Sequence, residues 1–141
     1  MERVAQCHCG QLKAIASGEP GRVYVCHCRS CQRRTGSVLH WGTRWEKSQV
    51  RLAGEAKIYT RRGDSGFDLR FHFCPQCGTS ILWEGDRAPE ICGIAGGCFA
   101  DLDFPAPTGS IYEEAMHSWL ALPSVAEHHD EAFPAAAPAR R

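Results

Sequence analysis

Seven of the nine cysteines fall into three short clusters whose spacing is typical of metal chelation. Thiolates two or three positions apart can point at one ion, and a glycine such as Gly78 permits the left-handed backbone that a tight turn around an ion can require. We therefore expect these thiolates to hold zinc. The clusters are Cys7-His8-Cys9, Cys26-His27-Cys28-Arg29-Ser30-Cys31 and Cys74-Pro75-Gln76-Cys77.

The second cluster can chelate an ion alone, because it has three cysteines. Three protein ligands with an open fourth position are typical of catalytic zinc, whereas four closed ligands are typical of structural zinc. The spacing leaves two divisions open. The first and third clusters can share a closed site and leave an open site at Cys26, Cys28 and Cys31. Alternatively, the third cluster pairs with two cysteines of the second, and Cys7 and Cys9 have another use.

Charge and hydropathy exclude several kinds of partner. Lys plus Arg equals Asp plus Glu at 16 each, so no overall field draws the chain to nucleic acid or to an anionic membrane. No signal-like segment opens the chain, and no run approaches the roughly twenty apolar residues of a membrane span. We expect a cytoplasmic protein, in which closely spaced cysteines are metal ligands more often than disulfides. Nothing in the sequence indicates the oligomeric state.

Short β-forming segments between glycine-containing turns predict one mostly β domain built from hairpins. Residues 113–120 are expected to form a short helix or an extended closing segment. From Ser124 the composition changes to Ala, Pro and charge, so we expect the domain to span 1–123 and 124–141 to form a disordered tail. The expected strands are 11–17, 22–26, 38–44, 50–52, 57–60, 68–73, 80–83 and 91–95.

Taken together, these motifs resemble the glutathione-dependent formaldehyde-activating enzyme family, which includes centromere protein V. The match runs from about Val4 to Pro123. Its cysteine spacing is highly specific. The residues that carry it are Cys-His-Cys-Gly from Cys7, Cys-His-Cys-x-x-Cys-Gln-Arg from Cys26, Phe-Cys-Pro-x-Cys-Gly from Phe73, Ala95-Gly96, Asp101, Pro105 and His-Ser-Trp-Leu from His117.

The resemblance implies an Mss4-like fold of folded-over antiparallel sheets clamped by a structural zinc, with two zinc ions per chain. A second, open zinc site would bind glutathione or a similar thiol and promote its addition to formaldehyde or another aldehyde. The product would be S-hydroxymethylglutathione, which makes the implied enzyme a carbon–sulfur lyase. The implied structural ligands are Cys7, Cys9, Cys74 and Cys77, and those of the open site are Cys26, Cys28 and Cys31.

Further residues are candidates for substrate binding or proton transfer. Arginines near the second cluster can hold substrate carboxylates, or they can be solvated surface. Three histidines are candidates for acid, base or fourth ligand. The alternatives are that His27 faces solvent, that His40 is a core residue and that His117 docks the closing segment. The arginines are Arg29, Arg33, Arg34 and Arg44, and the histidines are His27, His40 and His117. Aromatic candidates for the pocket are Tyr24, Trp41, Trp45, Tyr59, Phe67, Phe99 and Trp119.

Two other functions stay open. One is a non-catalytic, zinc-stabilised module that binds a protein or chromatin, although the neutral charge and the lack of a long basic stretch count against nucleic acid. The other is methionine sulfoxide reduction on a related fold, which needs a reactive thiol outside the clusters. Cys92 and Cys98 are the available thiols, and we expect both to be inert core residues.

Overall fold

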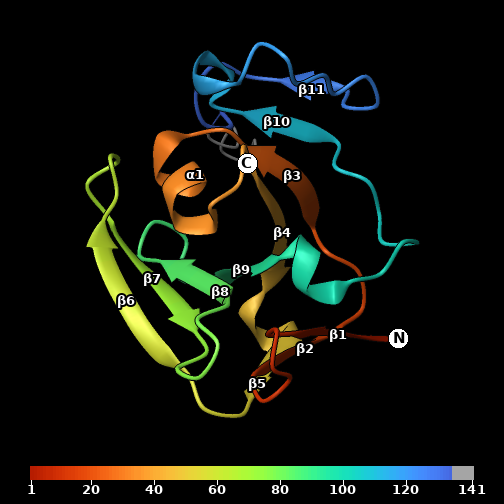
Figure 1. Ribbon diagram of the computed structural model, residues 1–141, viewed down its shortest axis with the longest axis vertical. Coiled ribbons are helices and arrows are strands. Elements are labelled where there is room, and N and C mark those ends of the chain that lie inside the picture. The colour runs from red at the N-terminus through yellow and green to blue at the C-terminus, as the bar shows by residue number, and fades with distance from the viewer. Residues whose placement is uncertain (135–141) are drawn as a thin grey trace, which may run out of the picture.

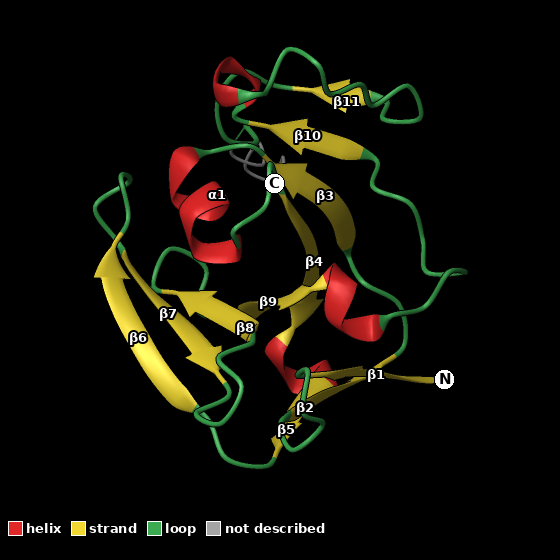
Figure 2. Ribbon diagram, viewed as in Figure 1, coloured by secondary structure: helices red, strands yellow, loops and turns green. Residues whose placement is uncertain are grey.

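The computed structural model describes residues 1–134, and this part of the chain is mostly β (Figures 1 and 2). The strands are β1 (Glu2–Gln6), β2 (Lys13–Ser17), β3 (Arg22–Cys26), β4 (His40–Glu46), β5 (Val50–Ala53), β6 (Lys57–Arg62), β7 (Asp68–Phe73), β8 (Ser80–Gly85), β9 (Ile91–Ala95), β10 (Gly109–Ile111) and β11 (Glu127–His128). The helices are α1 (Arg29–Thr35) and the short 3₁₀ segments η1 (Lys47–Gln49), η2 (Gly96–Phe99) and η3 (Glu113–Ala115). No helix in the described part is long and apolar enough to cross a membrane.

Two sheets enclose the core. The smaller has the order β1-β2-β5, and the larger has the order β11-β10-β3-β4-β9-β8-β7-β6. Small side chains such as Ala14 and Ala16 on the smaller sheet let it approach Trp45, Ile81 and Ile94 of the larger sheet closely, and all five side chains are almost completely buried. This burial of apolar surface holds the two sheets together.

The expected strands are confirmed, with ends that differ by a few residues. The strands from β3 to β9 within the larger sheet pair antiparallel, in agreement with the expected hairpins. However, β10 lies parallel to both β3 and β11, so the sheet is not purely antiparallel. A long connection after η2 carries the chain back to the edge at β3, and this makes the parallel pairing possible.

The sequence did not predict α1, which follows directly from the second cysteine cluster. The Cys28 sulfur accepts a hydrogen bond from the backbone N–H of Cys31 (3.3 Å), so Cys28 acts as the N-cap. Gly36 ends the helix in a left-handed conformation at φ 67°. Only seven residues long, α1 is too short to show a helical hydrophobic period. Figure 1 shows it between β3 and the loop that joins β6 to β7.

Residues 124–134 correct the expectation of a disordered tail from Ser124. Val125 is buried and β11 adds a strand to the larger sheet. Phe133 packs edge-on against Tyr24, with ring centres 5.6 Å apart, beneath the guanidinium of Arg22 at 4.0 Å. The low hydropathy of this segment is offset by a few specific contacts that composition alone does not reveal. The remainder of the predicted tail, 135–141, lies outside the described residues.

Phe133→Ala should destabilise the fold by about 1–3 kcal/mol, because it removes a partly buried ring and its aromatic and cationic contacts. Thermal unfolding followed by circular dichroism measures the loss. Phe67→Ala is the matched control, since that ring is 44% exposed. Equal stability of the two variants would mean that the segment 124–134 does not support the fold.

Candidate metal centres and the adjoining pocket

The structure brings four distant cysteines together. The sulfurs of Cys7, Cys9, Cys74 and Cys77 all lie within 4.8 Å of one another, an arrangement that can hold a metal ion. The first two follow β1, and the other two follow β7. Both loops end in a left-handed glycine whose N–H donates to the carbonyl of the first cysteine: Gly10 to Cys7 (3.0 Å) and Gly78 to Cys74 (2.8 Å). Two similar turns therefore face each other across the sulfurs.

Polar hydrogens point at these sulfurs. Gln11 Nε2 donates to Cys74 Sγ at 2.9 Å, and the backbone N–H of Leu12 donates to Cys7 Sγ at 3.3 Å. Desolvation raises the pKa of Cys74, but the bond from Gln11 and backbone N–H groups outweigh it and lower the pKa overall. Hydrogen bonds from Thr79 lower the pKa of Cys77 to about 5. Donors that stabilise thiolates are those that a zinc–thiolate centre requires.

A second group consists of Cys26, Cys28 and Cys31, whose sulfurs also lie within 4.8 Å of one another. Cys26 ends β3, while Cys28 caps α1 and Cys31 lies in its first turn. Hydrogen bonds from the neighbouring thiols of Cys26 and Cys31 lower the pKa of Cys28 to about 2, and the bond with Cys28 raises the pKa of Cys26. Ionisation of one of these thiols disfavours ionisation of its neighbours, and a bound cation would remove this mutual repulsion.

His27 anchors the loop between these ligands, and its side chain is completely buried, not solvent-facing as one alternative held. Its backbone N–H donates to the carbonyl of Ile111 (3.0 Å), and its own carbonyl accepts from Gln32 Nε2 (2.8 Å). The ring forms a hydrogen bond through Nε2 with Ser110 Oγ at 3.0 Å. His27 therefore ties the three-cysteine loop to β10.

An ion pair between His128 and Glu113 joins β11 to η3. His128 Nδ1 donates to Glu113 Oε1 at 2.6 Å, and Nε2 donates to the carbonyl of Val125 at 2.9 Å. Since both ring nitrogens face acceptors, the geometry favours the charged imidazolium. Accordingly, the bond with Glu113 raises the pKa of His128 above 6.5. Desolvation raises the pKa of Glu113, but bonds with Ser110 and His128 outweigh it and lower the pKa below 4.5.

This pair should contribute stability in a defined pH window. The contribution of His128 to stability is complete below pH 6.5 and is lost as pH rises through its higher folded pKa. The contribution of Glu113 is complete above pH 4.5 and is lost as pH falls through its lower folded pKa. Glu113→Gln should therefore lower Tm most between these pH values and bring the His128 pKa, followed by NMR, closer to 6.5. Glu114→Gln, at an exposed neighbour, is the control. An unchanged His128 pKa in Glu113→Gln would contradict the pairing.

The other candidate histidines differ in position. His40 is buried as expected, with its ring edge-on to Trp83 at 4.5 Å, and desolvation lowers its pKa to about 3, so it is neutral at pH 7. His117 is exposed, and its Nε2 forms a hydrogen bond with Gln32 Oε1 at 2.9 Å. It therefore docks the segment after η3 onto α1, as one alternative held.

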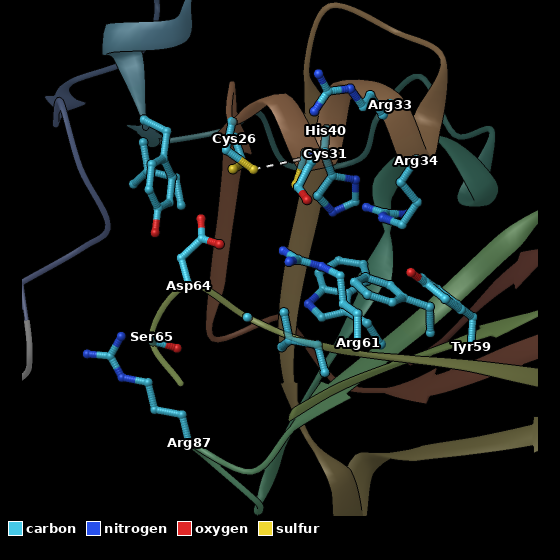
Figure 3. A pocket seen from close by; sticks show the side chains of 18 of the residues that line it. Cys26, Cys31, Arg33, Arg34, His40, Tyr59, Arg61, Asp64, Ser65 and Arg87 are labelled. Atoms are coloured by element: carbon cyan, nitrogen blue, oxygen red, sulfur yellow. Dashed lines mark hydrogen bonds between the residues drawn. The ribbon is translucent and has the colours of Figure 1, made fainter. Parts of the chain in front are cut away.

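The three-cysteine cluster opens into a pocket of about 600 Å³ (Figure 3). Its aromatic wall comes from several strands, and Gly93 makes room for one ring, because a Cβ there would lie 2.0 Å from Trp83. None of the four cysteines of the other cluster lines this pocket. The aromatic side chains in the lining are Tyr24, His40, Tyr59, Phe71, Trp83 and Tyr112.

Two of the three arginines next to the second cysteine cluster line the pocket. Arg33 and Arg34 extend from α1 into the lining, whereas Arg29 is exposed outside it. Arg44 also lies outside, with its guanidinium 5.5 Å from the centre of the Tyr24 ring. Sequence reasoning missed Arg61 and Arg87, which reach the pocket from β6 and from the loop after β8.

The aromatic and remaining cysteine candidates also separate. Tyr24 and Tyr59 line the pocket, whereas Trp41, Trp45 and Phe99 belong to the core and Phe67 and Trp119 are exposed. Desolvation raises the pKa of both Cys92 and Cys98 to about 11, the opposite of an activated thiolate. Neither thiol joins a metal cluster, so nothing in the site supports sulfoxide reduction.

The architecture defines a small β protein with an Mss4-like fold, in which one four-cysteine and one three-cysteine cluster can each hold a metal ion. A family model described as glutathione-dependent formaldehyde-activating enzyme matches residues 2–115, and the chain belongs to this family.

Comparison with solved structures supports the fold. The chain is similar to a protein from Rhodobacter sphaeroides, whose crystal structure was solved as a structural-genomics target. The TM-score is 0.55 at 21% sequence identity, and the alignment covers 74% of this chain and 91% of that one. At this identity the likeness is one of fold alone. No curated protein matches the chain.

Proposed function

We propose that the protein is a zinc-dependent, carbon–sulfur lyase-type enzyme that promotes the addition of glutathione or a similar thiol to formaldehyde or another aldehyde. The observation that carries the proposal is that the three-cysteine cluster lines a pocket of about 600 Å³, while the four-cysteine cluster does not. Closed sites are structural, and sites with a free position are catalytic. Membership of the family supports the same reaction.

The donor sets fit zinc at both clusters. Cys7, Cys9, Cys74 and Cys77 would provide four thiolates for a structural ion, and Cys26, Cys28 and Cys31 would provide three for a second ion. Held by these three thiolates, zinc would have a free position and would favour the thiolate form of an incoming thiol there. A reducing compartment such as the cytoplasm would keep the seven ligands available, and we propose that location.

The pocket also has groups that suit a peptide thiol. Arg33, Arg61 and Arg87 can hold carboxylates by charge-assisted hydrogen bonds, and Asp64 can accept one from an ammonium group. Figure 3 shows Asp64 and Arg87 on the side of the pocket opposite Arg34 and Tyr59. A thiol with two carboxylates and one amine would therefore meet complementary charges around its sulfur.

The proposal is tested by the rate at which the purified protein forms S-hydroxymethylglutathione from glutathione and ¹³C-formaldehyde, followed by NMR exchange spectroscopy. We expect a rate above the uncatalysed exchange that disappears when the weaker metal is removed. An exchange rate equal to the uncatalysed rate, measured with protein whose zinc sites are fully occupied, would favour the alternative, a non-catalytic module that binds a protein or chromatin.

A further inference from the structure

Arg34 has a fixed position beside the three-cysteine cluster. It lies three residues after Cys31 on α1, so both side chains lie on the same side of the helix. Its guanidinium carbon lies 4.9 Å from the centre of the Phe71 ring and 5.8 Å from that of Trp83, and Nη1 donates to Ser80 Oγ at 3.4 Å. Figure 3 shows the guanidinium directed into the pocket beside His40.

The charge of Arg34 has no carboxylate partner in the described part of the chain. Among residues 1–134, its polar contact is the neutral hydroxyl of Ser80, and no carboxylate forms an ion pair with it. By contrast, Arg70 on the neighbouring strand β7 is paired with both Glu84 and Asp86. The aromatic rings thus hold a guanidinium whose remaining N–H groups are available to a ligand in the pocket.

The proposed reaction creates an anion at this place. The thiolate sulfur of the substrate forms a bond with the carbonyl carbon, and the π electron pair of C=O moves to the oxygen. The resulting alkoxide then takes a proton from water to give the hydroxyl of the thiohemiacetal. Fixed donors aimed at such a developing charge stabilise the transition state strongly, because they need no reorganisation and act in a water-poor site.

We propose that Arg34 is a catalytic residue whose guanidinium donates hydrogen bonds to the aldehyde oxygen as it becomes an alkoxide. This inference rests on the proposed function of the same site. It differs from two other roles for Arg34, which are holding a carboxylate of the thiol substrate and balancing the charge of the cysteine thiolates. The three roles affect different measurable quantities, so one set of variants separates them.

The test compares Arg34→Gln with Arg29→Gln, which removes the same charge from the exposed side of the same helix. Three quantities are measured for each: zinc per chain, the Kd of glutathione by calorimetry and the kcat of S-hydroxymethylglutathione formation by NMR. For Arg34→Gln we expect two zinc ions, little change in Kd and a kcat lower by about 10²–10³-fold. Arg29→Gln should resemble wild type. Arg34→Lys should recover only part of kcat, because an ammonium lacks the planar fork of donors.

Other results would overturn the assignment in recognisable ways. A raised Kd with unchanged kcat in Arg34→Gln would make Arg34 a carboxylate-binding residue, like the role proposed for Arg33. Loss of the second zinc would make it a residue that balances thiolate charge. If wild-type protein binds glutathione and forms product while Arg34→Gln matches it in every quantity, Arg34 has no catalytic role. If wild type forms product no faster than the uncatalysed reaction, the proposed function fails as well.

Discussion

Cys74→Ser should lose one zinc ion and its native fold. Cys74 is completely buried, and its loop contributes half of the four-cysteine cluster that joins the end of β1 to the end of β7. A structural zinc contributes on the order of 10 kcal/mol in small zinc domains, which is comparable with the roughly 5–15 kcal/mol total stability of a typical protein. We therefore expect unfolding or aggregation in Cys74→Ser, measured by near-ultraviolet circular dichroism and metal analysis.

Cys92→Ala is the matched control for this change. Cys92 is also a buried cysteine, but it lies on β9 and belongs to neither cluster. The loss of its sulfur should cost about 1–2 kcal/mol through the small cavity that is left, and both zinc ions should remain. A folded Cys74→Ser protein with two zinc ions would show that the four-cysteine cluster is not a structural metal site.

Cys28→Ser should also lose one zinc ion, but it should keep most of the fold while glutathione binding is abolished. The serine hydroxyl can still accept the N–H of Cys31 and cap α1, so the local backbone is preserved. The core between the two sheets does not depend on this loop, whose position is held by His27 and Gln32. The expected loss in glutathione affinity is at least about 100-fold, or about 2.8 kcal/mol, measured by calorimetry.

The comparison that makes this result decisive is again between two cysteines. Cys98→Ser removes a partly buried thiol outside both clusters and should keep two zinc ions and the wild-type glutathione affinity. A global collapse of Cys28→Ser would show that the three-cysteine cluster is a second structural centre. Unchanged glutathione binding after loss of that zinc would show that the thiol binds elsewhere.

The cysteine clusters could be predicted from the local motifs of the sequence. Cysteines two or three positions apart must lie near one another in any fold, so each cluster was evident on its own. The pairing of Cys7 and Cys9 with Cys74 and Cys77 was different, because spacing left two divisions open and resemblance to the family favoured one. The structure places these four sulfurs together, since β1 and β7 end near each other.

The pocket was much less predictable, because its lining comes from separate strands and loops. Phe71 and Trp83 occupy strands that were expected, but the strand pattern did not show which face would meet the cysteines. Arg61 and Arg87 are both polar residues near turns, where most arginines are simply solvated. Arg61 reaches the pocket from β6 and Arg87 from the loop after β8, so their position there follows from how separate strands of the sheet come together.

Residues 124–134 were mispredicted for a related reason. Composition predicts whether a segment can bury enough apolar surface by itself, and this segment cannot. Residues 124–134 are ordered because single side chains fit into spaces on the rest of the fold. Phe133 packs where Gly109 leaves space, since a Cβ at that glycine would lie 2.7 Å from the ring. Long-range contacts of this kind leave no periodic pattern in the sequence.

The most direct test of the central claim is calorimetric titration of zinc-loaded protein with glutathione, before and after mild chelation removes the weaker metal. S-methylglutathione is the control ligand, because it keeps both carboxylates and the amine but has no thiol. We predict that glutathione binds, that S-methylglutathione binds at least about tenfold more weakly, and that removal of one zinc abolishes the difference. Equal binding of the two ligands by the zinc-loaded protein, or a preference for glutathione over S-methylglutathione that survives loss of that zinc, would contradict a thiol-binding metal site at Cys26, Cys28 and Cys31.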